Sequence, residues 1–112
     1  MSTVARLDET FHAPVRFAVM ATLLGVDRAE FSLVRDSAGV SDSVMSKQAS
    51  TLEAAGYLSI TKGYVGKRPR TWFSLTPVGR EAFTGHLQAL RQLADTAAAF
   101  APSDGEGVSS DH

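Results

Sequence analysis

The sequence between residues 39 and 56 is GVSDSVMSKQASTLEAAG, and its pattern predicts a turn followed by one helix. Ser41 is a good N-cap residue, because its hydroxyl can accept a bond from a free amide of the first turn. Gly56 is expected to end the helix in a left-handed conformation. One face carries apolar residues at helical spacing, namely Met45, Ala49 and Leu52. We therefore predict a helix over residues 42–55 that packs this face on a core.

The opposite side of the predicted helix carries small polar side chains. A rotation of about 100° per residue places Ser43, Lys47 and Ser50 on that side, with Gln48 at the edge of the apolar face. Serine pairs with either type of base, glutamine with adenine, and lysine with guanine or phosphate. An ordinary solvated face fits the same residues. If this helix reads DNA, the residues expected to contact the DNA are Ser41, Ser43, Val44, Ser46, Lys47, Gln48 and Ser50.

The sequence before this helix indicates three shorter elements. Pro14 suits the first turn of a helix that Gly25 ends. A very short strand is expected at Ala29–Phe31. Ser32 is then the expected N-cap of a two-turn helix that ends before Gly39.

After Gly56 the apolar period changes from helical to alternating, which is typical of strands. Alternation in residues 57–61 and 71–75 predicts a β-hairpin, with Gly63–Arg70 as a long tip. Thr76-Pro77 provides an N-cap and a first-turn proline for a last helix. One side of that helix should be lined by Ala82, Phe83, Leu87, Leu90, Ala94 and Ala97. This order of elements is that of a winged helix-turn-helix.

The predicted hairpin concentrates positive charge. Residues 62–80 contain no acidic side chain, and the tip holds three cations close together. Cations on a protruding loop can reach phosphates or a minor groove, although the same loop also fits a purely solubilising role. Trp72 is expected to pack at the base of the hairpin. The expected DNA contacts of this wing, residues 62–71, are Lys62, Lys67, Arg68, Arg70 and Thr71.

Composition limits the class of protein and the number of domains. The chain has 112 residues, no cysteine and a formal net charge of −1, which fits one soluble, cytoplasmic domain without disulfides. The charge is unevenly distributed, because residues 43–91 hold seven basic and two acidic side chains. The longest apolar run, FAVMATLLGV, is too short to span a membrane. We expect a winged-helix domain with dimerising terminal helices over residues 1–100 and a disordered acidic tail over residues 101–112.

Both ends of the expected domain are more apolar than so small a body requires. Uncovered apolar surface of this kind usually marks an interface. A homodimer would bury it, whereas the alternative is that the N-terminal segment and the last helix cover each other within one chain. The residues expected at the dimer interface are Val4, Leu7, Phe11, Phe83, Leu87, Leu90, Leu93, Ala94 and Ala97.

Catalytic and metal-binding patterns are weak in this sequence. The histidines His12, His86 and His112 are scattered, and without cysteines they do not form a set of metal ligands. Carboxylates do not form a pair suited to acid–base work, and a glycine-rich phosphate loop is missing. We expect no enzyme activity, no metal and no cofactor.

Five strings, in order along residues 7–95, resemble the small winged-helix transcriptional regulators of the MarR and ArsR type, above all their stand-alone DNA-binding members. They are HAPVR at 12–16, VSDSVMSKQ at 40–48, LEAAGYL at 52–58, GKRPRTW at 66–72 and LTPVGR at 75–80. The resemblance implies a mainly α (α+β) fold, with a two-stranded β wing and a C-terminal dimerisation helix. It implies a bacterial repressor or activator that binds an operator as a homodimer, and we expect a repressor.

The same resemblance implies base contacts from Ser43, Ser46, Lys47 and Gln48, and backbone contacts from the wing. The sequence departs from the family in the small Ala49 and in a net charge that is low for a DNA-binding protein. Two alternatives stay open. A winged-helix module that binds only protein would lack salt-dependent duplex binding, and a regulator that senses a small-molecule effector would need a pocket between the first and last helices.

Overall fold

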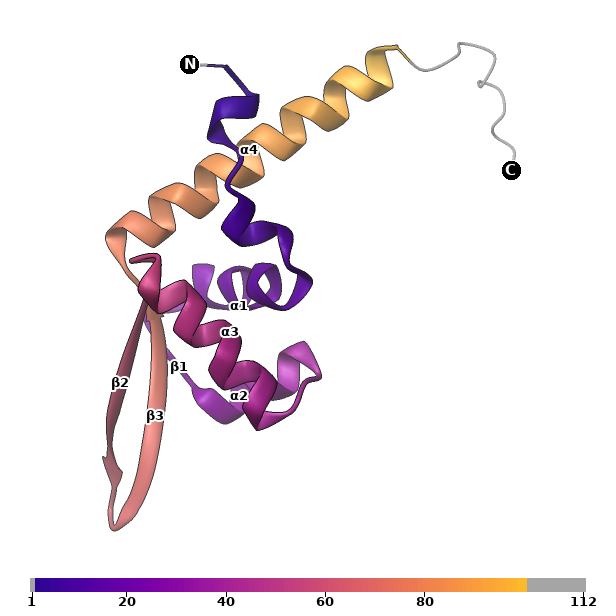
Figure 1. The fold of residues 1–112 in the computed structure, drawn as a ribbon. Helices are drawn as coiled ribbons and strands as arrows, with labels where there is room; N and C mark the ends of the chain where they lie inside the picture. The colour runs from indigo at the N-terminus through magenta and orange to yellow at the C-terminus, as the bar shows by residue number, and fades with distance from the viewer. Residues whose placement is uncertain (1, 101–112) are drawn as a thin grey trace.

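A computed structural model describes residues 2–100, so the tail expected at residues 101–112 lies outside the described residues. The elements are the 3-10 helices η1 (Val4–Arg6) and η2 (Glu9–His12), then α1 (Pro14–Leu24), β1 (Ala29–Glu30), α2 (Phe31–Ala38), α3 (Asp42–Ala54), β2 (Leu58–Val65), β3 (Arg68–Leu75) and α4 (Pro77–Ala99). Figure 1 shows α1, α2 and α3 gathered into one body. The hairpin β2–β3 extends from this body in one direction, and α4 runs from the hairpin base in the other.

Local signals place most helix ends where the sequence predicts them. Pro14 occupies the first turn of α1. The Ser41 hydroxyl caps α3 by accepting a hydrogen bond from the Val44 amide at 3.2 Å. The left-handed end expected at Gly56 is confirmed by its φ of 84°, and α2 ends before Gly39, as predicted, with Gly39 at a φ of 70°.

The expected cap of α2 is wrong. The helix begins at Phe31, one residue before Ser32, and Glu30 occupies the N-cap position without a side-chain bond. Strand β1 leads directly into this helix, so its geometry is set by pairing with β3 and not by a local cap. The Phe31 ring packs 5.5 Å, between centroids, from Phe73 of β3.

The sheet is antiparallel with the strand order β1-β3-β2. Every residue of Leu58–Val65 is paired with a residue of Arg68–Leu75, so the turn contains only Gly66 and Lys67. The long tip expected over Gly63–Arg70 is therefore wrong. Gly66 is the first of the two turn residues and has a φ of 64°, as the first residue of a type II′ turn does. The twist of such turns matches the twist of the strands they join.

The two residues that suggested a long tip lie within the strands. A Cβ at Gly63 would come within 3.3 Å of the Trp72 ring, so the glycine makes room for the indole. Pro69 faces Tyr64 one pair away from the turn. In a two-residue hairpin the residue pair that closes the turn is hydrogen-bonded, and hydrogen-bonded pairs alternate with non-hydrogen-bonded pairs along the strands. Pro69 belongs to the next, non-hydrogen-bonded pair, so its nitrogen points away from β2. On the other side of β3, β1 pairs only with Trp72 and Phe73, so no neighbouring strand needs an N–H donor at Pro69.

The core forms where α1, α2, α3, the sheet and the first half of α4 meet. It contains the predicted face of α3, and its buried residues are Phe11, Val19, Met20, Leu23, Ala29, Val34, Met45, Ala49, Leu52, Leu58, Phe73 and Phe83. The sequence places Phe11 and Phe83 at a dimer interface, but both are buried here, with ring centroids 5.1 Å apart. That part of the interface prediction is wrong, because the N-terminal segment folds back onto α4.

Helix α4 is buried only along its first half. Its buried residues are Gly79, Phe83, His86 and Ala89, while Leu90, Ala94 and Ala97 of the predicted apolar side are exposed. The helix begins close against the corner between α3 and β2. A Cβ at Gly79 would overlap the Tyr57 carbonyl group, so only glycine fits at this approach. Along residues 2–100, none of the helices has the length and apolar character needed to span a bilayer.

Candidate nucleic-acid interface

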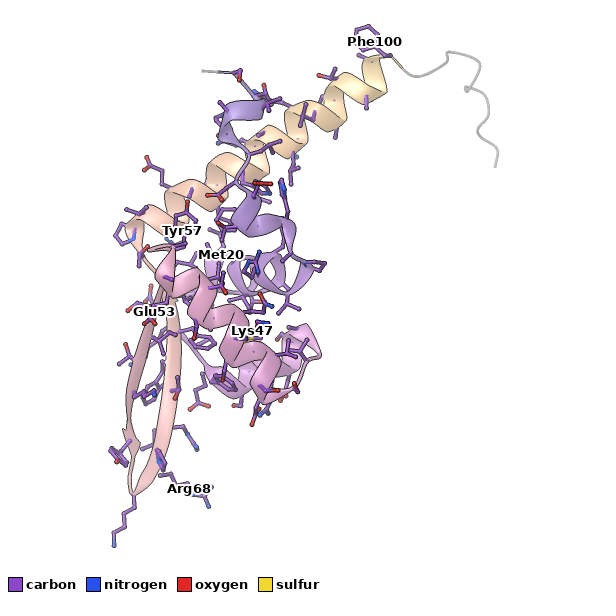
Figure 2. The ribbon with its side chains drawn as sticks, viewed as in Figure 1. Met20, Lys47, Glu53, Tyr57, Arg68 and Phe100 are labelled. Atoms are coloured by element: carbon purple, nitrogen blue, oxygen red, sulfur yellow. The ribbon has the colours of Figure 1, made fainter. Side chains whose placement is uncertain are left out.

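Helix α3 presents one exposed polar face. The side chains of Ser43, Val44, Ser46, Lys47 and Ser50 are all exposed, as is the N-cap Ser41. The opposite face is fully buried, so α3 is held in one orientation about its own axis. Figure 2 shows Lys47 on α3 and Arg68 near the end of the hairpin, both far from Phe100 at the end of α4.

The beginning of α3 is fixed to α2 by an ion pair. Arg35 of α2 donates from Nη1 to the Asp42 carboxylate at 2.7 Å and from Nε to Asp36 at 2.9 Å. Asp42 is the first residue of α3, where an unpaired carboxylate would repel an approaching phosphate. Its pairing with Arg35 reduces that repulsion and links the start of α3 to α2.

Gln48 differs from the other predicted reading residues. It is half-buried, and its Oε1 accepts a hydrogen bond from Nη1 of Arg16 at 2.7 Å. The Arg16 Nε donates to the Thr10 carbonyl at 2.7 Å, so the guanidinium ties α3 to the segment before α1. The amide oxygen of Gln48 is therefore occupied within the chain, and the structure does not place this residue with the exposed reading residues.

The wing divides its cations between two faces. Alternation along paired strands puts Ile60, Lys62 and Tyr64 on the face toward α3, together with Thr71 and Phe73. We call this the inner face. Arg68 and Arg70 belong to the outer face. Tyr64 is 72% exposed beyond the body of the protein, and sequence reasoning missed it because a tyrosine in an alternating run gives no separate signal.

Arg70 is not held clear of the body, contrary to the sequence-based expectation. Its Nε lies 3.1 Å from the Glu30 carboxylate, an ion pair that connects β3 with the end of β1. Beside it, the Arg28 guanidinium lies over the Trp72 ring at 4.7 Å from the centroid. Trp72 is half-buried at the junction of β1 and β3, as expected for a packing residue.

A cluster of titratable side chains lies at the opposite side of the body. Tyr57 donates its hydroxyl hydrogen to the Asp8 carboxylate, and the Asp8 amide donates to Nδ1 of His86 at 3.0 Å. Hydrogen bonding to Asp8 raises the pKa of Tyr57 to about 12. Burial opposes ionisation of Asp8, but bonds from Tyr57 and Thr10 outweigh it and lower its pKa. Burial, and then the nearby His12, lower the pKa of His86.

These contacts join the N-terminal segment, the α3–β2 corner and α4. His86 is 1% exposed, and its ring lies 5.3 Å from that of His12. Its burial was missed because an apolar-period search passes over histidine. Among residues 2–100, no cluster of three potential metal-binding side chains occurs. A hollow of about 240 Å³ lies between the end of α1 and α4, lined by Leu24, Thr84, Leu87, Gln88 and Arg91.

Comparison with known proteins identifies the class of this fold and surface. The family described as "Winged helix DNA-binding domain" matches residues 15–94, and the chain belongs to this family. The matched range contains α3, the whole wing and most of α4. The predicted winged-helix fold and the resemblance to small winged-helix regulators are confirmed, and the chain is a DNA-binding regulator of that class.

Individual relatives are similar but distant. A transcriptional regulator homologue from Pyrococcus horikoshii has a TM-score of 0.74 and 26% identity, covering 80% of this chain and 88% of its own. The PcaV transcriptional regulator from Streptomyces coelicolor has a TM-score of 0.73 at 19% identity, covering 93% and 75%, and so shows the fold alone. An uncharacterized protein of Methanocaldococcus jannaschii is 26% identical over 83 residues, 74% of this chain and 90% of that protein.

Proposed function

We propose that this chain represses transcription by binding an operator sequence in duplex DNA as a homodimer. The observation that carries the proposal is the exposed polar face of α3 beside a hairpin whose neighbourhood, residues 54–80, contains no acidic side chain. Such a surface attracts phosphates without internal competition over most of its area. Two of the structurally similar proteins are described as a transcriptional regulator or its homologue, which supports the same role here.

Base reading is assigned to the first two turns of α3. The N-terminal residues of a recognition helix meet base edges in the major groove. Ser43 and Lys47 offer a hydroxyl and an ammonium there, and the exposed Val44 offers an apolar surface that fits a thymine methyl group. Gln48 is left out of this set because Arg16 holds its amide oxygen.

The wing supplies contacts that do not depend on sequence. Arg68 and Lys67 lie at the free end of the hairpin, where exposed cations can reach the DNA backbone. Arg70 lies nearer the body and shares its charge with Glu30, so we assign it a smaller share of phosphate binding. Lys62 and Thr71 lie on the inner face, nearest to α3.

The dimer is assigned to the exposed apolar residues of α4 and the N-terminal segment. Leu90 and Leu93 are each 38% exposed and Phe100 is 84% exposed, on the part of α4 that extends past the body. The N-terminal segment is fixed alongside, because Arg6 donates to the side-chain oxygens of Gln88 and Gln92 at 3.2 and 2.6 Å. Leu7 and Leu87 are half-buried, so they belong to the edge of this surface.

Selection of bound fragments from genomic DNA, followed by affinity measurements at several salt concentrations, tests the DNA-binding part of the proposal. We expect an enriched sequence with two half-sites about 10 base pairs apart and an affinity that falls steeply with salt. Duplex binding that is absent or independent of salt would instead support a protein-binding module. Sedimentation equilibrium at micromolar concentration tests the dimer, and a monomer that stays one per site on DNA would contradict it.

A further inference from the structure

A cleft of about 280 Å³ lies between α3 and the inner face of the wing. Its walls come from α3, the hairpin that follows it and the start of α2. The lining residues are Ser46, Ala49 and Ser50 from α3, Ile60, Lys62, Thr71 and Phe73 from the hairpin, and Phe31 from α2. The cleft therefore spans the expected base-reading element and the expected backbone-binding element.

The small side chain of Ala49 helps to keep the cleft open. Ala49 is buried in the middle of α3, at a position that faces the sheet, and its methyl group leaves the space between α3 and β2 unfilled. The bottom of the cleft is apolar, formed by the packed rings of Phe31 and Phe73. This rigid floor fixes the distance between the helix and the inner face.

The rim of the cleft is polar and carries one positive charge. Ser46 and Ser50 line it from α3, and Lys62 and Thr71 line it from the hairpin. No carboxylate belongs to the lining residues, so Lys62 has no acidic partner within the cleft. Hydroxyl donors around an ammonium suit a singly charged anion with several acceptor oxygens.

We propose that this cleft is the seat of one DNA backbone phosphate, held jointly by α3 and the wing. The inference rests on the proposed function and assigns Ser46 and Ser50 to the backbone, not to bases. Lys62 supplies the charge, and the three hydroxyls direct the phosphate oxygens. Because this phosphate is held from both sides, it sets the register of α3 in the major groove.

The proposal separates Lys62 from the other lysine of the wing. Lys67 lies in the two-residue turn at the end of the hairpin, away from the cleft, and is also exposed. Replacing either lysine by methionine removes one charge and retains most of the aliphatic side chain. Lys67→Met is therefore a matched control for Lys62→Met.

The test is a scan of an operator duplex in which each phosphate in turn is replaced by a neutral methylphosphonate. For the wild-type protein, we expect one such linkage in each half-site, at the position of the cleft, whose neutralisation lowers affinity about tenfold. Lys62→Met should lower the affinity for the unmodified duplex by a similar factor and abolish the effect at that linkage alone. Thr71→Val should reduce the effect of the same linkage, and Lys67→Met should leave it unchanged.

Circular dichroism of each variant confirms folding before the scan. If Lys62→Met lowers the affinity equally for every modified duplex, so that no linkage loses its effect in this variant, the shared phosphate seat is overturned. The proposal that the protein binds DNA would not be affected. If the wild-type protein shows no salt-dependent duplex binding at all, the proposed function is overturned as well. If Lys67→Met, and not Lys62→Met, abolished the effect of one linkage, the phosphate contact would lie at the turn, which would contradict the proposed seat in the cleft.

Discussion

The two ends of this molecule each expose one face of a helix, but one exposed surface is polar and the other is apolar. At the α3 and wing end, the exposed side chains include hydroxyls and cations such as Ser43, Lys47 and Arg68, and residues 54–80 carry no acid. At the far end of α4, the exposed side chains include Leu90, Leu93 and Phe100. A polyanion is bound through charge and hydrogen bonds, whereas a second copy of the chain is bound through apolar area. The contrast supports the proposed assignment of DNA to the α3 and wing end and of a second copy to the far end of α4.

The largest expected effect comes from placing a charge in the apolar end. In Leu93→Asp, an unpaired carboxylate would lie in the proposed dimer interface, where burying it costs several kcal/mol. We expect a monomer at micromolar concentration and a loss of affinity for a two-half-site operator of about 100-fold. Sedimentation equilibrium and duplex titration measure both.

Thr84→Asp is the matched control, because it makes the same charge change on the exposed surface of α4. That variant should remain a dimer. If Leu93→Asp also remains a dimer with unchanged operator affinity, the far end of α4 is not the interface.

A smaller effect is expected at the reading end. Lys47→Ala should weaken operator binding by about 1–3 kcal/mol and reduce the preference for operator over random duplex, because the lost contact is to a base. Lys67→Ala should weaken operator and random duplex alike. Competition titrations measure the preference, and an unaltered preference in Lys47→Ala would reject this residue as a reader.

The cluster between the two ends should make stability depend on pH. Burial lowers the pKa of His86 below its ordinary value of 6.5, so the unfolded chain binds the proton more readily. The free energy of unfolding should therefore fall as the pH drops below 6.5, by at most about 1.4 kcal/mol per pH unit for this one group.

Urea unfolding between pH 5 and 8 measures this dependence. His86→Gln should flatten it, since glutamine can accept the Asp8 amide hydrogen bond without titrating. The exposed His12→Gln is the control and should change the profile less. An identical slope in wild type and His86→Gln would assign the dependence to other groups.

The smallest effect is expected at the end of the wing. Arg68→Ala should lower the slope of log affinity against log salt by about 0.9, equally for all sequences, through loss of one phosphate contact. Arg70→Ala should change the slope less, because Glu30 already neutralises part of that charge. Equal slopes for wild type and Arg68→Ala would remove this residue from the contact surface.

Elements governed by neighbouring residues are predictable from this sequence. The Ser41 cap, the start at Pro14 and the end at Gly39 each depend on chemistry within one turn. The apolar face of α3 follows from spacing in the same way. For that reason the helix-turn-helix, and the exposure of Ser43 and Lys47, are found where the sequence predicts them.

Features governed by distant contacts were not predictable. Arg16 and Gln48 are 32 residues apart, and the pairing of Arg70 with Glu30 depends on β1 joining β3. The hairpin is longer than expected because Gly63 makes room for an indole within a strand and does not mark a turn. No local pattern distinguishes that role from a loop glycine.

Gly79 has a consequence for how proteins of this design can diverge. Its backbone lies directly against Tyr57, so this close approach helps to set the direction in which α4 leaves the body. In the proposed dimer that direction determines the separation of the two reading helices. A side chain at position 79 would force α4 away from Tyr57, and in the proposed dimer we expect this shift to change the accepted spacer length between half-sites and not the preferred bases. Spacing and base preference are therefore properties that substitutions can alter independently.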